Sequence, residues 1–229
     1  MTTNTMMKQT AFAELAAMSE PRLPVLLLLD TSGSMQGQPM ADLLEGYRRF
    51  LEIDDELVLK RVDLAVMTFS GTGGVKLLKD FRPLGRKDEL SLPYLTADGN
   101  TPMSEAIETA VQVVRTRCRV YDEAGIPRYI PWILMISDGE PTDDISKARE
   151  LLCQREGRLK FFCVAVNNAN TDVLTSLSPR VIQCTKENEF SRIFDWLGES
   201  MTIVSASRVG ENPQLPNLPE NFRVVPTDW

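Results

Sequence analysis

Residues 25–34 read Val-Leu-Leu-Leu-Leu-Asp-Thr-Ser-Gly-Ser. An uninterrupted apolar run that ends at turn residues is typical of a strand buried on both faces. Asp30, Ser32 and Ser34 then fall at alternate positions in the loop that follows. In open α/β sheets, ligands bind beyond the carboxyl ends of the strands. The stretch therefore predicts a parallel sheet with a polar loop at its binding edge.

This loop has two interpretations from its residues alone. One carboxylate and two hydroxyls are hard oxygen donors, which suit Mg²⁺, Mn²⁺ or Ca²⁺, and Gly33 lets the backbone turn tightly so that the oxygens converge. Ser and Asp are also favoured helix N-caps, and a helix is expected to begin near Pro39. A metal site and a helix cap stand about equal on this evidence.

The composition bounds the class of protein. The chain has 229 residues and a hydrophobic fraction of 43%, for which one domain is the natural expectation. A net charge of −7 argues against nucleic acid as the main partner and leaves room for a local basic patch. The sequence contains no histidine, which excludes Ser-His-Asp and Cys-His catalysis and His-containing zinc sites.

The cysteines and the apolar segments give expectations about the compartment. Cys118, Cys153, Cys163 and Cys184 include no Cys-x-x-Cys pair, and we expect four buried free thiols in a reducing environment. No apolar stretch approaches the roughly 20 residues that span a bilayer, and the N-terminus makes a poor signal peptide. We therefore expect a cytoplasmic protein without a membrane partner.

Strand-like and helix-like segments alternate along the chain. The Gly-rich link at 70–74 is too short for a crossover helix, so the strands on either side should pair antiparallel. It lacks a Gly-Lys-Ser/Thr ending and is interpreted as a turn rather than a phosphate cradle. Expected strands are 25–29, 62–69, 75–81, 132–137, 159–166 and 181–184, and expected helices are 39–53, 102–123, 144–156, 173–177 and 189–205.

This order predicts an α/β protein, a three-layer α/β/α sandwich with a mostly parallel sheet and one antiparallel edge strand. Residues 1–20 are interpreted as an N-terminal arm, 21–207 as the folded domain and 208–229 as an extended, Pro-rich C-terminal tail.

Two further loops carry oxygen ligands at the same predicted edge. Asp138 follows the strand 132–137, and Thr101 precedes a helix whose first position suits Pro102. On local grounds Thr101 is expected to cap that helix. Thr142, Asp143 and Asp144 lie near Asp138 in the sequence and either shape the rim of the site or cap the helix after them, and capping is the favoured interpretation.

Taken together, the five positions resemble a known motif. Asp30-x-Ser32-x-Ser34, a distant Thr101 and Asp138-Gly139 look like the metal-ion-dependent adhesion site of von Willebrand factor A (vWA) domains, over roughly residues 22–207. The resemblance implies the Rossmann-like vWA fold. It also implies that Ser32, Ser34 and Thr101 contact the metal directly or exchange with water, while Asp30 and Asp138 act through bound waters and hydrogen bonds.

A narrower resemblance rests on short motifs around these positions. Arg22-Leu23-Pro24, the segment 98–103, Ile126-Pro127 and the segment 138–143 look like small stand-alone bacterial proteins of the YegL and TerY type. The latter are associated with tellurite-resistance gene clusters. Proteins of this group are not known to carry an enzymatic activity, and they are thought to act as metal-dependent interaction modules, sometimes beside kinase-like and phosphatase-like proteins.

The leading hypothesis is therefore a non-enzymatic binding module that uses a divalent cation, Mg²⁺ first. Neutral hydroxyl ligands leave the cation's charge incompletely cancelled, so an Asp or Glu carboxylate from a protein partner would complete the shell. The alternative is a Mg²⁺-dependent phosphohydrolase with Asp30 as nucleophile. Ser32 stands where haloacid-dehalogenase-type enzymes carry a second Asp, which removes the general acid. A third hypothesis, a structural subunit with a vestigial site, is weakened by the complete five-residue set.

Overall fold

The computed structural model describes residues 20–186 and 190–227. The arm expected at 1–20 lies outside the described residues except for Glu20, and so does the first residue of the helix expected at 189–205.

A single sheet runs through the described part of the chain in the order β3-β2-β1-β4-β5-β6-β7. Its strands are β1 Leu23–Asp30, β2 Val62–Ser70, β3 Gly74–Pro83, β4 Trp132–Ser137, β5 Lys160–Ala165, β6 Val181–Cys184 and β7 Phe222–Val224. Strands β2, β1, β4, β5 and β6 are parallel, while β3 and β7 run antiparallel at the two edges. The central strands β1 and β4 are buried along their whole length, as their continuous apolar sequences predict.

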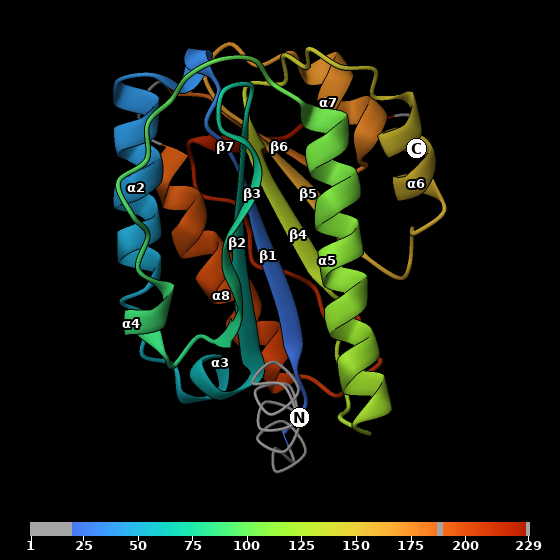
Figure 1. Ribbon diagram of the computed structural model, residues 1–229. Coiled ribbons are helices and arrows are strands. Elements are labelled where there is room, and N and C mark those ends of the chain that lie inside the picture. Colours follow the sequence, from blue (N-terminus) through green and yellow to red (C-terminus); the bar gives the residue numbers. More distant parts are fainter. Residues whose placement is uncertain (1–19, 187–189, 228–229) are drawn as a thin grey trace, which may run out of the picture.

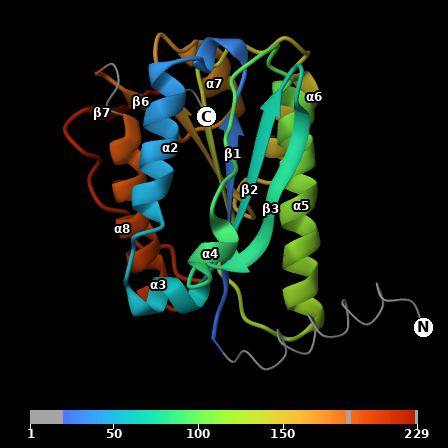
Figure 2. The same cartoon turned by 60° about the vertical axis from the view of Figure 1, so that its left-hand side comes forward.

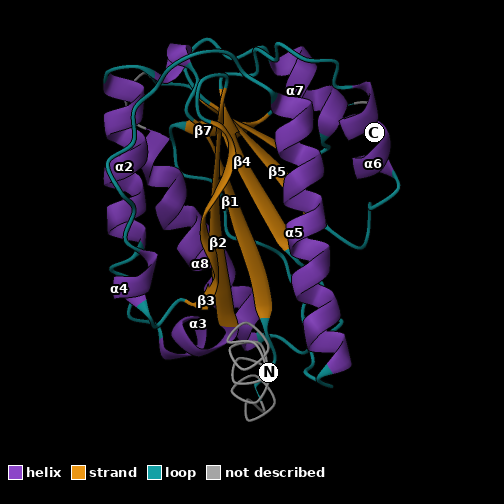
Figure 3. Cartoon of the chain, in the orientation of Figure 1, coloured by secondary structure: helices purple, strands orange, loops and turns teal. Residues whose placement is uncertain are grey.

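Helices cover both faces of this sheet, and the strands are seen between two helical layers in Figures 1 and 3. The helices are α2 Gln38–Phe50, α3 Glu56–Arg61, α4 Lys87–Leu90, α5 Met103–Glu123, α6 Ser146–Cys153, α7 Thr171–Leu177 and α8 Ile193–Ala206, with 3₁₀ turns η1 Gly33–Met35 and η2 Phe190–Arg192. Figure 2 shows α2, α3 and α8 on one side of the sheet and α5 on the other.

The alternation of side chains along β1 divides the apolar core in two. Leu27 and Leu29 pack in the core under α2 and α8, whereas Leu26 and Leu28 pack in the core under α5, α6 and α7. Successive strand residues point to opposite faces of a sheet, so one buried strand serves both layers. The predicted three-layer α/β/α class is confirmed.

The expected antiparallel pairing of β2 with β3 is confirmed, with Phe69 opposite Val75 across the Gly-rich turn. The expectation of one antiparallel edge strand is incomplete, because β7 is a second one at the opposite edge. Segment 208–227 lies against the domain: Trp196 Nε1 donates to the Pro216 carbonyl at 3.0 Å, and Leu215 and Leu218 pack on the core.

Three of the four cysteines are buried, as expected, but Cys153 is exposed at the end of α6. The expectation of four buried thiols is therefore wrong for Cys153, because this residue lies on the solvent side of the helix while Leu152 beside it faces the core. No helix within the described ranges combines the length and the apolarity that crossing a bilayer requires.

Candidate metal centre

The carboxyl ends of β1 and β4 place two polar residues side by side. The strands pair in parallel up to Leu29 and Ile136, so the next residues, Asp30 and Ser137, are neighbours. Ser137 Oγ donates to Asp30 Oδ2 at 2.6 Å, and the Ser32 amide donates to Asp30 Oδ1 at 2.8 Å. The Asp30 side chain is therefore fully buried and fixed through both carboxylate oxygens.

Above Asp30, two hydroxyls face each other. Ser32 Oγ and Ser34 Oγ are 3.1 Å apart, with Ser32 buried and Ser34 exposed. Neither makes a capping hydrogen bond: η1 has no side-chain cap at Ser32, and α2 begins after Gly37, also without one. The cap interpretation of this loop is thus wrong, and its hydroxyls are available to a ligand.

Asp138 is the second carboxylate at this edge. Its side chain is buried, and its carbonyl accepts from the Asn170 amide at 2.8 Å. The next residue, Gly139, has a φ of 74°, and a Cβ there would lie 2.8 Å from the Asn170 carbonyl oxygen. Only glycine fits this turn without strain. The Gly139 amide also donates to Ser137 Oγ at 3.0 Å, which aims the Ser137 hydroxyl hydrogen at Asp30.

The electrostatics of the two carboxylates favour a cation. Burial raises the pKa of Asp30, the nearby Asp138 carboxylate raises it further, and the hydrogen bonds from Ser137 and Ser32 act in the opposite direction. No basic side chain of the described residues is among the groups that shift this pKa. A divalent cation near Asp30 would favour its charged form, so the electrostatics of this residue fit such an ion.

Thr101 reaches this edge on a loop that backbone hydrogen bonds join to its neighbours. The Asp98 amide donates to the Thr31 carbonyl at 2.9 Å, and the Gly33 amide donates to the Gly99 carbonyl at 3.1 Å. Thr101 is buried, and its hydroxyl makes no hydrogen bond to the described residues. The structure thus brings the Thr101 loop against the Ser32–Ser34 loop.

A second set of contacts holds Thr101 to the loop after β4. The Thr101 amide donates to Thr142 Oγ1 at 3.1 Å, and the Thr142 amide donates to the Thr101 carbonyl at 2.9 Å. Asp143 accepts from the Ser104 and Glu105 amides at 3.1 Å each. Asp143 therefore caps α5 from a distant loop, and the expectation that Thr101 caps this helix is wrong.

The expected caps of the next helix are corrected in the same way. Asp144 supports the start of α6 by accepting from the Ser146 amide at 2.9 Å, while Thr142 and Asp143 serve the loop and helix around Thr101. Sequence reasoning missed Ser137 as a residue that positions the site, and it placed Asp143 near the site without identifying its contact with α5. The sequence does not reveal either contact, because strand register and loop packing determine the partners.

The candidate ligands at the carboxyl ends of the strands determine which kind of cation would fit there. Within the described residues, no group of three or more His, Cys, Asp or Glu side chains could hold a metal ion. A cation at this edge would meet two carboxylates and serine and threonine hydroxyls, all of them oxygen donors. Such donors suit hard cations better than soft ones.

Comparisons with solved structures agree with this fold. A paralog of ArnB, VWA2 from Sulfolobus acidocaldarius, is 16% identical with a TM-score of 0.52 over 80% of this chain and 46% of its own. The vWF domain of the type V pili tip protein Mfa5 from Porphyromonas gingivalis is 11% identical with a TM-score of 0.59 over 85% and 99%. Proximal thread matrix protein 1 from the mussel byssus, with a zinc-occupied MIDAS motif, is 12% identical with a TM-score of 0.58 over 82% and 46%.

At these identities the likeness shows the fold. The chain spans less than half the length of several of the solved structures that it resembles. None of the curated proteins compared with the chain matches it. The family model of the von Willebrand factor type A domain matches residues 25–196, which is most of the chain. The fold, the site at the strand ends and this match together show that the chain belongs to the von Willebrand factor type A domain family.

Proposed function

We propose that this vWA domain is a non-enzymatic interaction module that binds a divalent cation through Asp30, Ser32, Ser34, Thr101 and Asp138. The observation that carries the proposal is the pair of Ser32 and Ser34 hydroxyls, 3.1 Å apart, beside two buried carboxylates that lack a basic partner among the described residues. Family membership supports it, because vWA domains typically mediate protein–protein contacts.

Each residue has a separate role in this proposal. Ser32, Ser34 and Thr101 hold the cation through their neutral hydroxyls. Asp30 and Asp138 supply negative charge through bound water and hydrogen bonds. When bound, the cation offers an electrophilic position to an anionic oxygen. We propose Mg²⁺ as the ion, and Mn²⁺ and Ca²⁺ share its preference for oxygen ligands. The mussel byssus protein carries zinc in its own MIDAS motif.

The partner would be a protein that presents an Asp or Glu carboxylate. Ser34 is exposed, so a partner side chain can approach the centre over this residue. Asp30, by contrast, is fully buried and both of its oxygens accept hydrogen bonds. A nucleophile must reach its substrate, and this burial supports an interaction role over hydrolysis by Asp30.

We propose further that the domain is of the YegL and TerY type and works beside kinase-like or phosphatase-like proteins, in a setting such as stress response or tellurite resistance. This narrower proposal is supported by the motifs Arg22-Leu23-Pro24, 98–103 and 138–143. Neighbouring genes for such proteins would support it, and their absence from the native gene cluster would count against it.

The test is capture of partners with wild type, Ser34→Ala and Asp30→Ala, each in Mg²⁺ and in EDTA. Ser91→Ala, at an exposed position directly after α4, is the matched control. We expect capture by wild type and Ser91→Ala in Mg²⁺ only, and strong loss with the two site variants. In parallel, Mg²⁺ should raise the midpoint of thermal unfolding of wild type but not that of Ser34→Ala. Equal capture with and without EDTA would contradict the proposal.

A further inference from the structure

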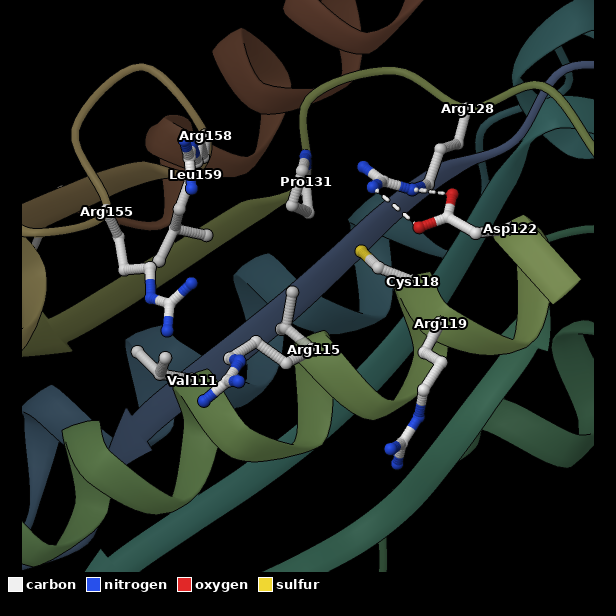
Figure 4. A pocket seen from close by; sticks show the side chains of 11 residues that line it. Val111, Arg115, Cys118, Arg119, Asp122, Arg128, Pro131, Arg155, Arg158 and Leu159 are labelled. Atoms are coloured by element: carbon white, nitrogen blue, oxygen red, sulfur yellow. Dashed lines mark hydrogen bonds and ion pairs between the residues drawn. The ribbon is translucent and has the colours of Figure 1, made fainter.

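A cavity lies at the amino ends of the strands, whereas the candidate metal centre lies at their carboxyl ends. It has a volume of about 210 Å³ and lies between α5 and the segments that lead into β4 and β5. Pro131 and Leu159 directly precede those strands, so the cavity sits at their amino ends. Figure 4 shows its lining, with an apolar floor that includes Val111 and Leu159.

Five arginines line this cavity in a chain whose net charge is −7. They are Arg115, Arg119, Arg128, Arg155 and Arg158. The single acid in the lining, Asp122, is already paired with Arg128 at 2.8 Å, as the dashed lines in Figure 4 mark. Within the described residues, the other four guanidinium groups form no ion pair. The cavity therefore carries an uncompensated positive charge.

Arg155 adds a second, independent observation. Its side chain extends from the loop after α6 toward α5 in Figure 4. Its Nε atom is buried and has no hydrogen-bond acceptor in the described part of the chain. Buried donors in folded proteins nearly always have a partner, so this N–H is an open position for an acceptor oxygen.

The arginines are not explained by helix capping. Cations are favourable near the last turn of a helix, but the last turn of α5 contains no basic residue. Arg115 lies two turns before the helix end, on the side that faces the cavity. Arg115, Arg119 and Arg158 are exposed, so water screens their mutual repulsion, and an anion in the cavity would add a direct counter-charge.

We propose that this cavity is a binding site for the phosphoryl group of a soluble phosphorylated compound, with Arg115 and Arg155 as its principal donors. Guanidinium groups present planar, paired N–H donors that match phosphate oxygens. The apolar floor formed by Val111, Val114 and Leu159 lowers the local dielectric constant and strengthens those charged hydrogen bonds. Arg158 and Arg119 add positive charge at the border of the site.

Calorimetric titration with pyrophosphate tests this site. The titration uses the full chain in buffer freed of divalent cations, so that a cation at the metal centre cannot contribute. We expect Arg155→Gln and Arg115→Gln each to weaken pyrophosphate binding by about tenfold or more, the usual effect of losing a charged hydrogen bond. Arg155→Lys should recover only part of the affinity, because it keeps the charge and loses the paired geometry.

Arg149→Gln is the matched control. Arg149 is exposed on the neighbouring helix α6, does not line the cavity and forms no ion pair with the described residues, so its loss should leave binding within about twofold. Thermal unfolding of each variant without ligand separates lost binding from lost folding.

Several outcomes would overturn the proposal. Equal pyrophosphate affinity in wild type and Arg155→Gln would remove the cavity from consideration. Equal affinity for sulfate and pyrophosphate would indicate a general anion patch without phosphoryl preference. Vesicles with anionic phospholipids, or a short RNA, that bind in an Arg155-dependent way while pyrophosphate does not would reassign the arginines to a membrane or nucleic-acid surface.

Discussion

Two buried aspartates show how differently the same side chain is used in this protein. Asp63, near the start of β2, is fully buried. Its Oδ1 lies 2.9 Å from Arg22 Nη2, and its Oδ2 lies 2.7 Å from Arg117 Nη2. The Tyr121 hydroxyl also donates to Oδ2. Burial raises the pKa of Tyr121, and the Asp63 charge adds to this effect. Asp30 is equally buried but has no basic neighbour acting on its pKa. Asp63 is therefore neutralised by the protein, whereas the charge of Asp30 is left for a ligand.

This contrast gives a prediction for Asp63→Ala. Removing one partner from a buried ion pair leaves unpaired charges behind and costs about 3–5 kcal/mol. We expect a loss of this size in the free energy of unfolding, measured by chemical denaturation. Asp30→Ala should instead abolish the stabilisation by Mg²⁺. If Asp63→Ala unfolded at the wild-type denaturant concentration, the two arginines would have to be neutralised elsewhere.

At the residue scale, the sequence predicts the candidate metal-ligating residues better than it predicts the residues that position them. Asp30 is recognisable because it ends a buried strand, Ser32 and Ser34 because they follow it at alternate positions, and Asp138 because it directly follows β4. The contacts of Ser137 and Asp143 are not recognisable, since one depends on the register of β1 against β4 and the other on the packing of a distant loop. Their roles are properties of the folded chain.

At the scale of elements, the crossing of α2 and α8 depends on one small residue. A Cβ at Gly46 would lie 2.5 Å from Phe194 Cδ2 and 2.9 Å from Ser191 Cα. Tyr47, Phe50 and Phe194 pack around this point, with ring centroids 5.9–6.5 Å apart. The helices meet closely because position 46 has no side chain.

We predict that Gly46→Ala destabilises the protein. Alanine is favoured over glycine within a helix by about 1 kcal/mol, but overpacking a dense core typically costs about 1–3 kcal/mol. The backbone at Ser191 cannot move aside as a flexible side chain would. We expect a lower midpoint of urea unfolding for Gly46→Ala, and little change for Gln112→Ala on the exposed face of α5. A rise in the midpoint would show that the helices can separate at low cost.

The long elements are the ones that the sequence predicts. The buried strands and α5 have clear apolar patterns, and their positions agree with the structure to within a few residues. Helices α3 and α4 and strand β7 were not predicted, because these short segments lack the apolar run that marks the equally short strands β4 and β6. The helix expected at 144–156 is shorter in the structure, Ser146–Cys153, because a polar loop takes up its first residues.

At the scale of the whole molecule, we propose that segment 208–227 belongs to the folded unit. Its strand β7 pairs with β6, and the Asn221 carbonyl accepts from the Thr185 amide at 2.8 Å. Deletion of residues 208–229 should lower the midpoint of thermal unfolding and expose the Trp196 side chain, which shifts its fluorescence to the red. Leu215→Ser combined with Leu218→Ser should give a smaller effect in the same direction. An unchanged midpoint after deletion would make the segment a dispensable tail.

The burial of the thiols gives a second prediction at this scale. Burial raises the pKa values of Cys118 and Cys163, and Cys184 is also buried, while Cys153 is exposed. Reaction with a thiol reagent at pH 8 should therefore modify one group quickly and the other three only as the protein unfolds. Cys153→Ser should remove the fast reaction alone. Two or more fast thiols in the native protein would contradict the described packing.

Helix α5 connects the two ends of the molecule. Its start is held by Asp143 next to the Thr101 loop, and its later turns carry Arg115 and Arg119 to the cavity at the amino ends of the strands. At 1.5 Å per residue, its 21 residues form a rod about 30 Å long. A ligand that displaces this rod at one end acts on the other, and such thermodynamic coupling is reciprocal. If a bound cation changed the affinity for phosphate by some factor, bound phosphate would change the affinity for the cation by the same factor.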